Sequence, residues 1–276
     1  MEIAPELLER GAVVVDLGAD FRLRDRADWE RVYGKPHIAW EEAELAVYGI
    51  PELHRDEIRA SRLVANPGCF SSAVILGPAP LARAGMLGGA EVYVTGLSGT
   101  AGVGAELSVA AHHPEIGNNV VFYNVVDHRH TYEMEQELAV AGAPGTRVHF
   151  TPSYVPITRG IAVVCNAAVP NGATLEDIRR IYGEAYGDEP FVRLMNEPCE
   201  PGASRQWRPY PSVSAVSGTN FCHIGMDLDE RRGRLVVFSV LDNLGKGGAH
   251  AGVQNLNVMF GLPETTGLTR FGLHPY

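Results

Sequence analysis

The sequence predicts a globular α/β protein, because short β-branched runs alternate with segments of helical periodicity and the composition can fill a core. The chain has 276 residues, of which 45% are hydrophobic and 20% are charged, and it contains 31 glycines for turns and loops. This length suits one large domain or about two of ordinary size. Internal repeats, low-complexity tracts and long charge runs are absent from the sequence, which argues against a fibrous or disordered protein.

The elements before residue 70 end in a turn that carries a cysteine. In order, they are a short helix, a buried parallel strand, a second short helix and a second strand: residues 4–10, a run from Ala12, residues 26–33 and a run from Arg62. The second strand runs into Asn66-Pro67-Gly68, which is typical of a turn. This turn places Cys69 at the start of the next helix.

The rest of the chain continues the alternation of strands and helices. Helical spacing over residues 71–87 is interrupted by Pro78 and Pro80, since proline breaks a helix interior. Strands are predicted from Glu91 and over 147–155, 160–169 and 234–243, and helices over 174–187 and 249–260. Residues 198–212, rich in proline and serine, are predicted to form a long surface loop.

Charge and cysteine usage narrow the possible partners and location. The 23 basic and 33 acidic residues give a net charge of -10, which provides no general surface for nucleic acid or an anionic membrane. The four cysteines form no CxxC pair, no apolar run reaches membrane-spanning length, and the N-terminal residues are acidic. We therefore expect a cytoplasmic protein that binds a small molecule, with any anionic ligand held locally.

Cys69 is the strongest candidate nucleophile in the sequence. A thiol at a helix N-terminus meets backbone N–H donors and the positive end of the helix dipole, and both favour the thiolate. A thiolate there is suited to attack an activated acyl carbon. The alternative is that Cys69 simply fills the core, as most free cysteines do.

A group of polar residues at 127–133 supplies candidates for proton transfer. It contains His128, His130 and Glu133, in a pattern that suits a base oriented by a carboxylate. A solvated polar turn is the alternative. A metal site that also includes His112 and His113 is a weaker interpretation, because paired ligand motifs such as HExxH are missing.

Two glycine-rich loops and two arginines are candidates for ligand binding. Residues 98–104 follow a predicted strand and offer free backbone donors, and residues 242–249 place glycines and Lys246 at a helix N-terminus. Arg159 and Arg193 suit a carboxylate or phosphate. Flexible turns and surface salt bridges are the alternatives.

Ten segments in the same order resemble one enzyme family across nearly the whole chain. They are VVDLGADFRL, AVYGIPEL, LVANPGCF, SGTAGVGAE, HRHTYEMEQEL, VPITRGI, DEPFVR, SGTNF, LDNLGKGGAHAGVQNLN and GLPETTGL. Together they resemble the N-acetyl-gamma-glutamyl-phosphate reductases of arginine biosynthesis, relatives of aspartate-semialdehyde dehydrogenase. This resemblance implies a partial Rossmann-like nucleotide domain, an α+β catalytic domain with a large mixed sheet, and a homo-oligomer, either dimer or tetramer.

The resemblance also implies a mechanism and roles for individual residues. Cys69 would attack an acyl phosphate to form a thioester, which NADPH would then reduce to a semialdehyde. The other implied site residues are His128, the preferred base, and His130 for proton transfer, with Glu133 supporting them; Ser98, Gly99, Tyr123 and Arg159 at the substrate; and Asn243, Lys246 and Gly247 at the NADP cofactor. No metal is implied.

One motif of the family has no counterpart in the sequence. No GxxGxxG turn for the NADP diphosphate precedes Ala12, so we expect an N-terminally shortened nucleotide domain over 1–68. A catalytic and oligomerisation domain would follow over 69–241, with a return to the nucleotide domain over 242–276. We expect such a chain to bind NADP weakly and to have little activity.

Two alternatives to the arginine-pathway enzyme stay open. The segments HHPE, RPYPSVSAVSGTN and GLHPY resemble the lysine-pathway relative that reduces a carrier-linked aminoadipyl phosphate. An acidic carrier favours a basic surface, which a net charge of -10 makes less natural. The other alternative is an inactive scaffold left after loss of the phosphate-binding part.

Overall fold

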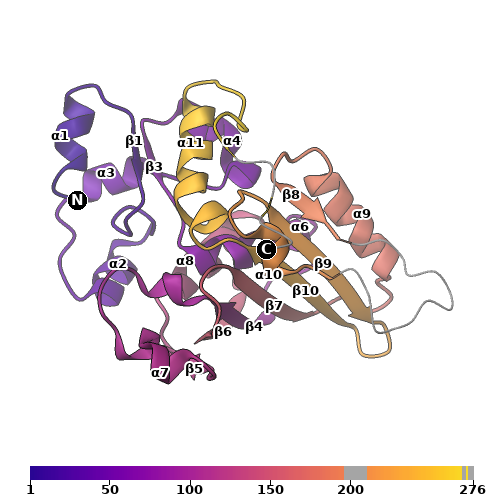
Figure 1. Cartoon of the computed structure of the whole chain (residues 1–276). Coiled ribbons are helices and arrows are strands. Elements are labelled where there is room, and N and C mark those ends of the chain that lie inside the picture. The colour runs from indigo at the N-terminus through magenta and orange to yellow at the C-terminus, as the bar shows by residue number, and fades with distance from the viewer. Residues whose placement is uncertain (196–209, 269–271, 273–276) are drawn as a thin grey trace.

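The N-terminal part of the chain forms a small parallel sheet with helices around it (Figure 1). The computed structural model describes residues 1–195, 210–268 and 272. The strands pair in the order β1-β3-β2, all parallel. The elements of this part are α1 (Ala4–Glu9), β1 (Val14–Asp16), α2 (Arg26–Tyr33), α3 (Trp40–Leu45), β2 (Val47–Tyr48), α4 (Pro51–Ala60) and β3 (Leu63–Ala65).

A seven-stranded mixed sheet forms the larger part of the molecule. Its strand order is β5-β6-β4-β7-β10-β9-β8, in which the β4–β6 and β8–β9 pairs are parallel and the others antiparallel. The strands are β4 (Glu91–Ser98), β5 (Val121–Phe122), β6 (Arg147–Tyr154), β7 (Ile161–Ala168), β8 (Val192–Leu194), β9 (Cys222–Asp229) and β10 (Arg234–Leu241).

Helices cover one face of this sheet, because alternate strand residues are apolar on that side. Residues of α5 (Cys69–Leu76), α6 (Ala79–Arg83), α8 (His130–Val140) and α9 (Leu175–Tyr186) share one apolar core with every second residue of the long strands. Strand β4 shows the pattern, with Val92 and Val94 buried and Tyr93 exposed between them. Burial on one side only is the property that orients an amphipathic strand.

The chain finally returns to the small sheet. The segment η3 (Gly245–Ala249) leads into α11 (His250–Met259), which packs against α4 and β1. Val258 of α11 lies in an apolar cluster with Ile58 and Val64 of the N-terminal part. Short elements complete the chain: η1 (Thr100–Val103), η2 (Val109–Ala111), α7 (His113–Ile116) and α10 (Val213–Val216).

The predicted fold class is confirmed, and so are most of the predicted elements. Helix α9 begins at a capping box in which Thr174 and Asp177 bond each other's backbone N–H, a local signal that sequence carries. Sequence reasoning missed α3, α4 and β9; α4 is kinked at His54, which disturbs its periodicity. The predicted loop over 198–212 lies mostly outside the described residues. Within the described ranges, none of the helices is both long and apolar enough to cross a membrane.

Candidate active site

The turn between β3 and α5 opens into a cavity of about 630 Å³. Both parts of the molecule line the cavity: Leu17, Arg22 and Val32 come from the N-terminal part, and the other walls come from the turn after β3, from loops around the large sheet and from the C-terminal return. Seven of the residues predicted from sequence meet at this cavity: Cys69, Ser98, Tyr123, His128, His130, Asn243 and Gly247. The other four, Gly99, Glu133, Arg159 and Lys246, lie outside its lining.

Cys69 is the first residue of α5 and is only partly exposed. Burial raises the pKa of its thiol, and the backbone N–H of Phe70 and the charge of Arg22 oppose that shift. The helix N-terminus therefore lowers the pKa of Cys69, as the sequence predicts, but burial raises that pKa by more. The resting thiol is less acidic than a free cysteine, which leaves a small thiolate fraction at neutral pH.

His128 is held as a neutral ring with a defined tautomer. Its Nδ1 accepts a hydrogen bond of 3.1 Å from the backbone N–H of His130, so the proton of the neutral imidazole lies on Nε2. Burial, together with the neighbouring His130 and the charge of Arg129, lowers the pKa of His128 to about 3. The ring therefore presents an N–H donor at the cavity throughout the neutral pH range.

His130 packs tightly under the nucleophile's turn. A β-carbon added to Gly68 would lie 2.4 Å from its Nε2, so only glycine leaves room for this ring. Burial holds the pKa of His130 well below its usual value, and its buried Nδ1 has no hydrogen-bond partner among the described residues.

Glu133 contacts the turn more closely than it contacts the histidines. Its Oε2 accepts hydrogen bonds from the hydroxyl of Tyr48 at 2.6 Å and from the backbone N–H of Gly68 at 3.1 Å. Its Oε1 lies 3.5 Å from Nη1 of Arg22 and 3.9 Å from Nε2 of His130. The carboxylate therefore acts first on the backbone that precedes Cys69.

Aromatic rings and a serine form another side of the cavity. The rings of Tyr123 and Tyr154 are stacked with centroids 4.2 Å apart. Ser98, at the end of β4, is buried and donates its hydroxyl hydrogen to the carbonyl of Gly99. Gly99 is needed for close packing, since a β-carbon there would lie 2.7 Å from the carbonyl oxygen of Thr158.

Arg159 lies beside the cavity and is bound to an aspartate. Its guanidinium is 3.0 Å from Oδ2 of the fully buried Asp242. The arginine side chain is about one third exposed, so part of it remains accessible to solvent. This contact explains how the arginine is held, and its predicted role at the substrate stays a prediction.

The C-terminal return supplies an amide and a glycine wall. Oδ1 of Asn243 accepts a 2.7 Å hydrogen bond from the backbone N–H of Gly160, whereas its buried Nδ2 has no partner among the described residues. Gly247 lies directly against the nucleophile, because a β-carbon there would come within 2.9 Å of Cβ of Cys69. Gly247 thus leaves room for a ligand beside Cys69, and Nδ2 of Asn243 can donate a hydrogen bond to it.

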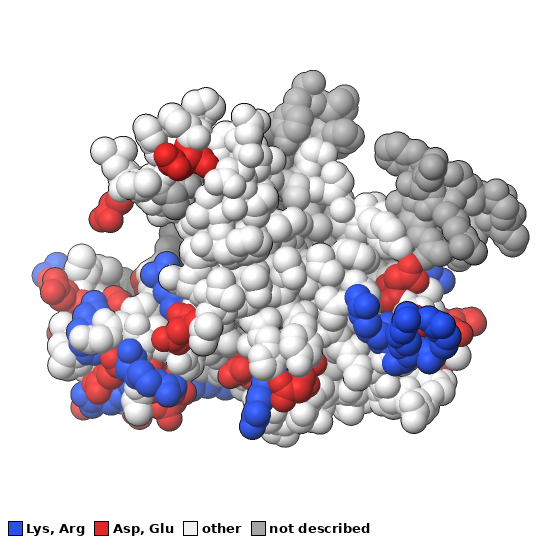
Figure 2. Space-filling view, turned by 90° about the horizontal axis from the view of Figure 1, so that it is seen from below, with Lys and Arg blue, Asp and Glu red and all other residues white. Residues whose placement is uncertain are grey.

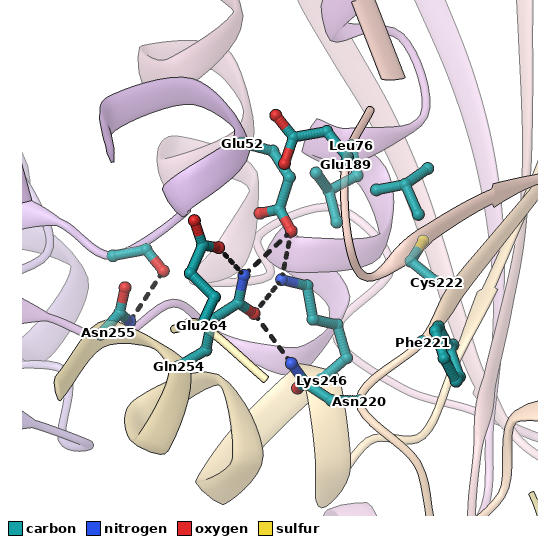
Figure 3. A network of polar contacts seen from close by, with 12 residues as sticks. Glu52, Leu76, Glu189, Asn220, Phe221, Cys222, Lys246, Gln254, Asn255 and Glu264 are labelled. Carbon is teal, nitrogen blue, oxygen red and sulfur yellow. Dashed lines mark hydrogen bonds and ion pairs between the residues drawn. The ribbon is translucent and has the colours of Figure 1, made fainter. Parts of the chain in front are cut away.

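Lys246 points away from the cavity. Figure 3 shows its ammonium directed at Glu52 and Gln254, at 2.6 and 2.7 Å. The side chain is 3% exposed, so it occupies a buried polar network. The sequence predicts that Lys246 contacts the cofactor. In the structure its charge is paired with Glu52 instead, so that role stays a prediction.

Sequence reasoning missed Arg22, Tyr48 and Tyr154. Arg22 and Tyr48 were present in the family segments VVDLGADFRL and AVYGIPEL, but neither segment suggests contact with Glu133, 111 and 85 residues away. Among the described residues, no group of three or more His, Cys, Asp or Glu side chains is arranged to hold a metal ion. The structure therefore adds no ligand set to the metal interpretation of the histidines.

Two family models match most of the chain. One, described as "Semialdehyde dehydrogenase, NAD binding domain", matches residues 1–61. The other, described as "Semialdehyde dehydrogenase, dimerisation domain", matches residues 69–243. A solved aspartate semialdehyde dehydrogenase II from Vibrio cholerae has a similar fold, with a TM-score of 0.66 at 18% identity over 94% of this chain and 76% of that one.

Curated relatives are similar over the full length of the chain. The N-acetyl-gamma-glutamyl-phosphate reductase of Methanopyrus kandleri is 45% identical over 275 residues, which are 100% of this chain and 76% of the relative. The LysW-L-2-aminoadipate 6-phosphate reductase of Deinococcus radiodurans is 43% identical over 271 residues, 98% of this chain and 75% of the relative.

Proposed function

Because the chain belongs to the semialdehyde dehydrogenase family, we propose that it reduces N-acetyl-gamma-glutamyl phosphate to N-acetylglutamate 5-semialdehyde in arginine biosynthesis. The family consists of oxidoreductases that act on semialdehydes or acyl phosphates with a nicotinamide dinucleotide. The observation that carries the proposal is the convergence of Cys69, His128 and Gly247 on one cavity. The reductant in this proposal is NADPH.

Acyl transfer to Cys69 is the first step. The thiolate Sγ attacks the acyl carbon, the bond from that carbon to the phosphate oxygen breaks, and phosphate leaves with the electron pair. The product on the protein is a thioester. The N–H of Phe70, which faces the thiol at the start of α5, stabilises the negative sulfur before attack.

Hydrogen bonding by His128 belongs to the second step. A bound nicotinamide would supply a hydride to the thioester carbon, and the former carbonyl oxygen would then carry a negative charge. The Nε2–H of neutral His128 donates a hydrogen bond to that oxygen and so stabilises its charge. When the oxygen re-forms its double bond to carbon, the C–S bond breaks, and the aldehyde and the Cys69 thiolate are released.

The residues near Cys69 fit a flat nicotinamide ring. Gly247 presents no side chain where a β-carbon would touch Cys69, so a ring can approach the acyl carbon closely. At the same wall, Asn243 offers an Nδ2 donor that is unpaired within the described part of the chain. We assign these two residues to the cofactor, whereas Lys246 stabilises their loop from the opposite side.

We also propose that the protein is a homo-oligomer joined through the open face of the large sheet. That face carries Tyr93, Val164, Val236 and Phe238, none of which is buried. In the view from below, a broad area free of Lys, Arg, Asp and Glu lies among charged patches (Figure 2). Multi-angle light scattering tests this proposal: a monomer at micromolar concentration would contradict it.

A second candidate substrate is a carrier-linked aminoadipyl phosphate. The relative from Deinococcus radiodurans is nearly as similar to this chain as the one from Methanopyrus kandleri. The two substrates share the acyl-phosphate chemistry and differ by one methylene and by the attached carrier. Sequence identity therefore does not distinguish the two candidate substrates. An assay that compares turnover of both substrates does.

The activity is tested in the reverse direction, with N-acetylglutamate 5-semialdehyde, NADP and phosphate, while nicotinamide reduction is followed by absorbance. We expect slow phosphate-dependent turnover, because no GxxGxxG turn for the NADP diphosphate precedes Ala12, and Cys69→Ala should abolish it. A second assay uses no nucleotide: the acyl phosphate is added, and intact mass spectrometry detects a thioester on Cys69 together with released phosphate. A folded chain that forms no thioester with either acyl phosphate would support the inactive scaffold instead.

A further inference from the structure

Arg22 is a buried cation at the edge of the cavity that the proposed chemistry does not use. It is 8% exposed and lines the cavity next to the nucleophile's turn. Its Nε donates a 2.8 Å hydrogen bond to the carbonyl of Asn66, and its Nη2 donates one of 3.2 Å to the carbonyl of Leu17. Both of these hydrogen bonds are to backbone carbonyls, so they restrain the main chain directly.

Glu133 holds the other end of the same turn. Its carboxylate accepts the N–H of Gly68 and lies 3.5 Å from the Arg22 guanidinium. The hydroxyl of Tyr48 donates to it at 2.6 Å, which orients the carboxylate from the side of β2. Arginine and glutamate thus contact the residues at positions 66 and 68, immediately before Cys69.

We propose that Arg22 is a positioning residue for Cys69: with Glu133, it fixes the turn from Asn66 to Gly68 and so sets the position and the reactivity of the thiol. This role rests on the proposed function of Cys69 as nucleophile. It connects the N-terminal part of the chain to the turn before the reacting sulfur, because Arg22 and Asn66 are 44 residues apart in sequence. The planar guanidinium fork suits the task, because it donates in several fixed directions at once.

The electrostatic signs give the proposal a distinctive signature. The positive charge of Arg22 lowers the pKa of Cys69, and the negative charge of Glu133 raises it. Removing one charge therefore shifts the ionisation of the thiol in one direction, and removing the other shifts it in the opposite direction. A merely structural pair would destabilise the fold without producing opposite shifts.

The test measures alkylation of Cys69 by iodoacetamide as a function of pH. Labelling of the Cys69 peptide is quantified by mass spectrometry in a Cys199→Ser background; Cys165 and Cys222 are buried. We expect Arg22→Met to move the midpoint up by about half to one pH unit, which slows labelling at pH 7 by about three- to tenfold. Glu133→Gln should move it down, while Arg22→Lys should keep the midpoint near that of the parent but lower the plateau rate.

Arg24→Met is the matched control. Arg24 lies two residues away, is exposed, and pairs with Glu137 rather than with the turn, so its loss should leave the midpoint unchanged. Equal midpoints in the parent, Arg22→Met and Glu133→Gln would overturn the proposal. If Arg22→Met does not fold, the opposite behaviour of Glu133→Gln and the lowered plateau of Arg22→Lys still decide it. Alkylation needs neither substrate nor nucleotide, so its outcome is separate from that of the reductase assay.

Discussion

The ammonium of Lys246 and the carboxylate of Glu52 form an ion pair of 2.6 Å, although 194 residues separate them in sequence. Both side chains are almost completely buried, and the charge of Lys246 lowers the pKa of Glu52 against the opposing effect of burial. The pair ties the glycine wall beside Cys69 to α4. The ion pair therefore stabilises the wall of the cavity without contacting the cavity itself.

Breaking this pair should destabilise the protein strongly. Lys246→Met leaves the carboxylate of Glu52 buried without its cation, and we expect a loss of about 3–5 kcal/mol in the free energy of unfolding. Adding Glu52→Gln removes the stranded charge and should recover part of the loss. Urea denaturation measures both, with Arg59→Met as control, because the Arg59–Asp56 pair is exposed and close to neutral in effect. A single mutant as stable as the control would contradict this assignment.

Gly247→Ala should impair chemistry more than folding. The new β-carbon would lie 2.9 Å from Cβ of Cys69 and 3.2 Å from the carbonyl of Asp242, so the wall must shift and narrow the space for the nicotinamide. We expect at least about a tenfold loss of kcat/KM, which corresponds to roughly 1.4 kcal/mol. Gly183→Ala is the control: this glycine lies inside α9 with open space at its β-carbon, and alanine should stabilise the helix by about 0.5–1 kcal/mol.

The pH dependence of the reductase should follow the thiol alone. Burial raises the pKa of Cys69, so below that pKa the thiolate fraction and kcat/KM should rise about tenfold per pH unit through neutral pH. His128 stays neutral above about pH 3, so it should add no inflection near pH 6.5. His128→Asn should lower kcat by roughly 10²–10⁴ and leave the rising limb in place. An inflection near pH 6.5 that His128→Asn removes would refute the buried neutral ring.

Acid should destabilise the fold through His128 and His130. In the unfolded chain His128 and His130 bind protons below about pH 6.5, whereas in the folded protein burial holds both pKa values far lower. The unfolded state thus binds more protons, and the free energy of unfolding should fall by about 1.4 kcal/mol per pH unit and per histidine below pH 6.5. Urea denaturation between pH 7 and 5 checks this, and His128→Asn should show a shallower pH dependence than the parent.

Local patterns were sufficient for most of the fold. The N-cap Asp25 and the capping box at Thr174 mark the starts of α2 and α9, and alternation in β4 and β7 marks which side of each strand is buried. Elements with weak local signals were missed. Helix α3 spans only six residues and has no side-chain cap, so its place depends on packing in the N-terminal cluster.

The site was predictable only where chemistry is carried within one segment. Cys69 lies directly after a Pro-Gly turn, and His128 and His130 lie at the start of α8, so each is close in sequence to the element that presents it. The contacts of Glu133 and Lys246 were not predictable, because each is set by a partner many residues away: Gly68 and Tyr48 for the first, Glu52 for the second.

The sequence by itself determined the α/β class, the candidate nucleophile and the groups available for proton transfer, because these follow from periodicity, turn residues and side-chain chemistry. Only the tertiary structure decided their state. Burial, which depends on what packs around each group, raised the pKa of Cys69 and lowered that of His128. The choice of partners likewise turned Glu133 toward the Gly68 turn and Lys246 away from the cavity, since ion pairs and hydrogen bonds form between neighbours in space.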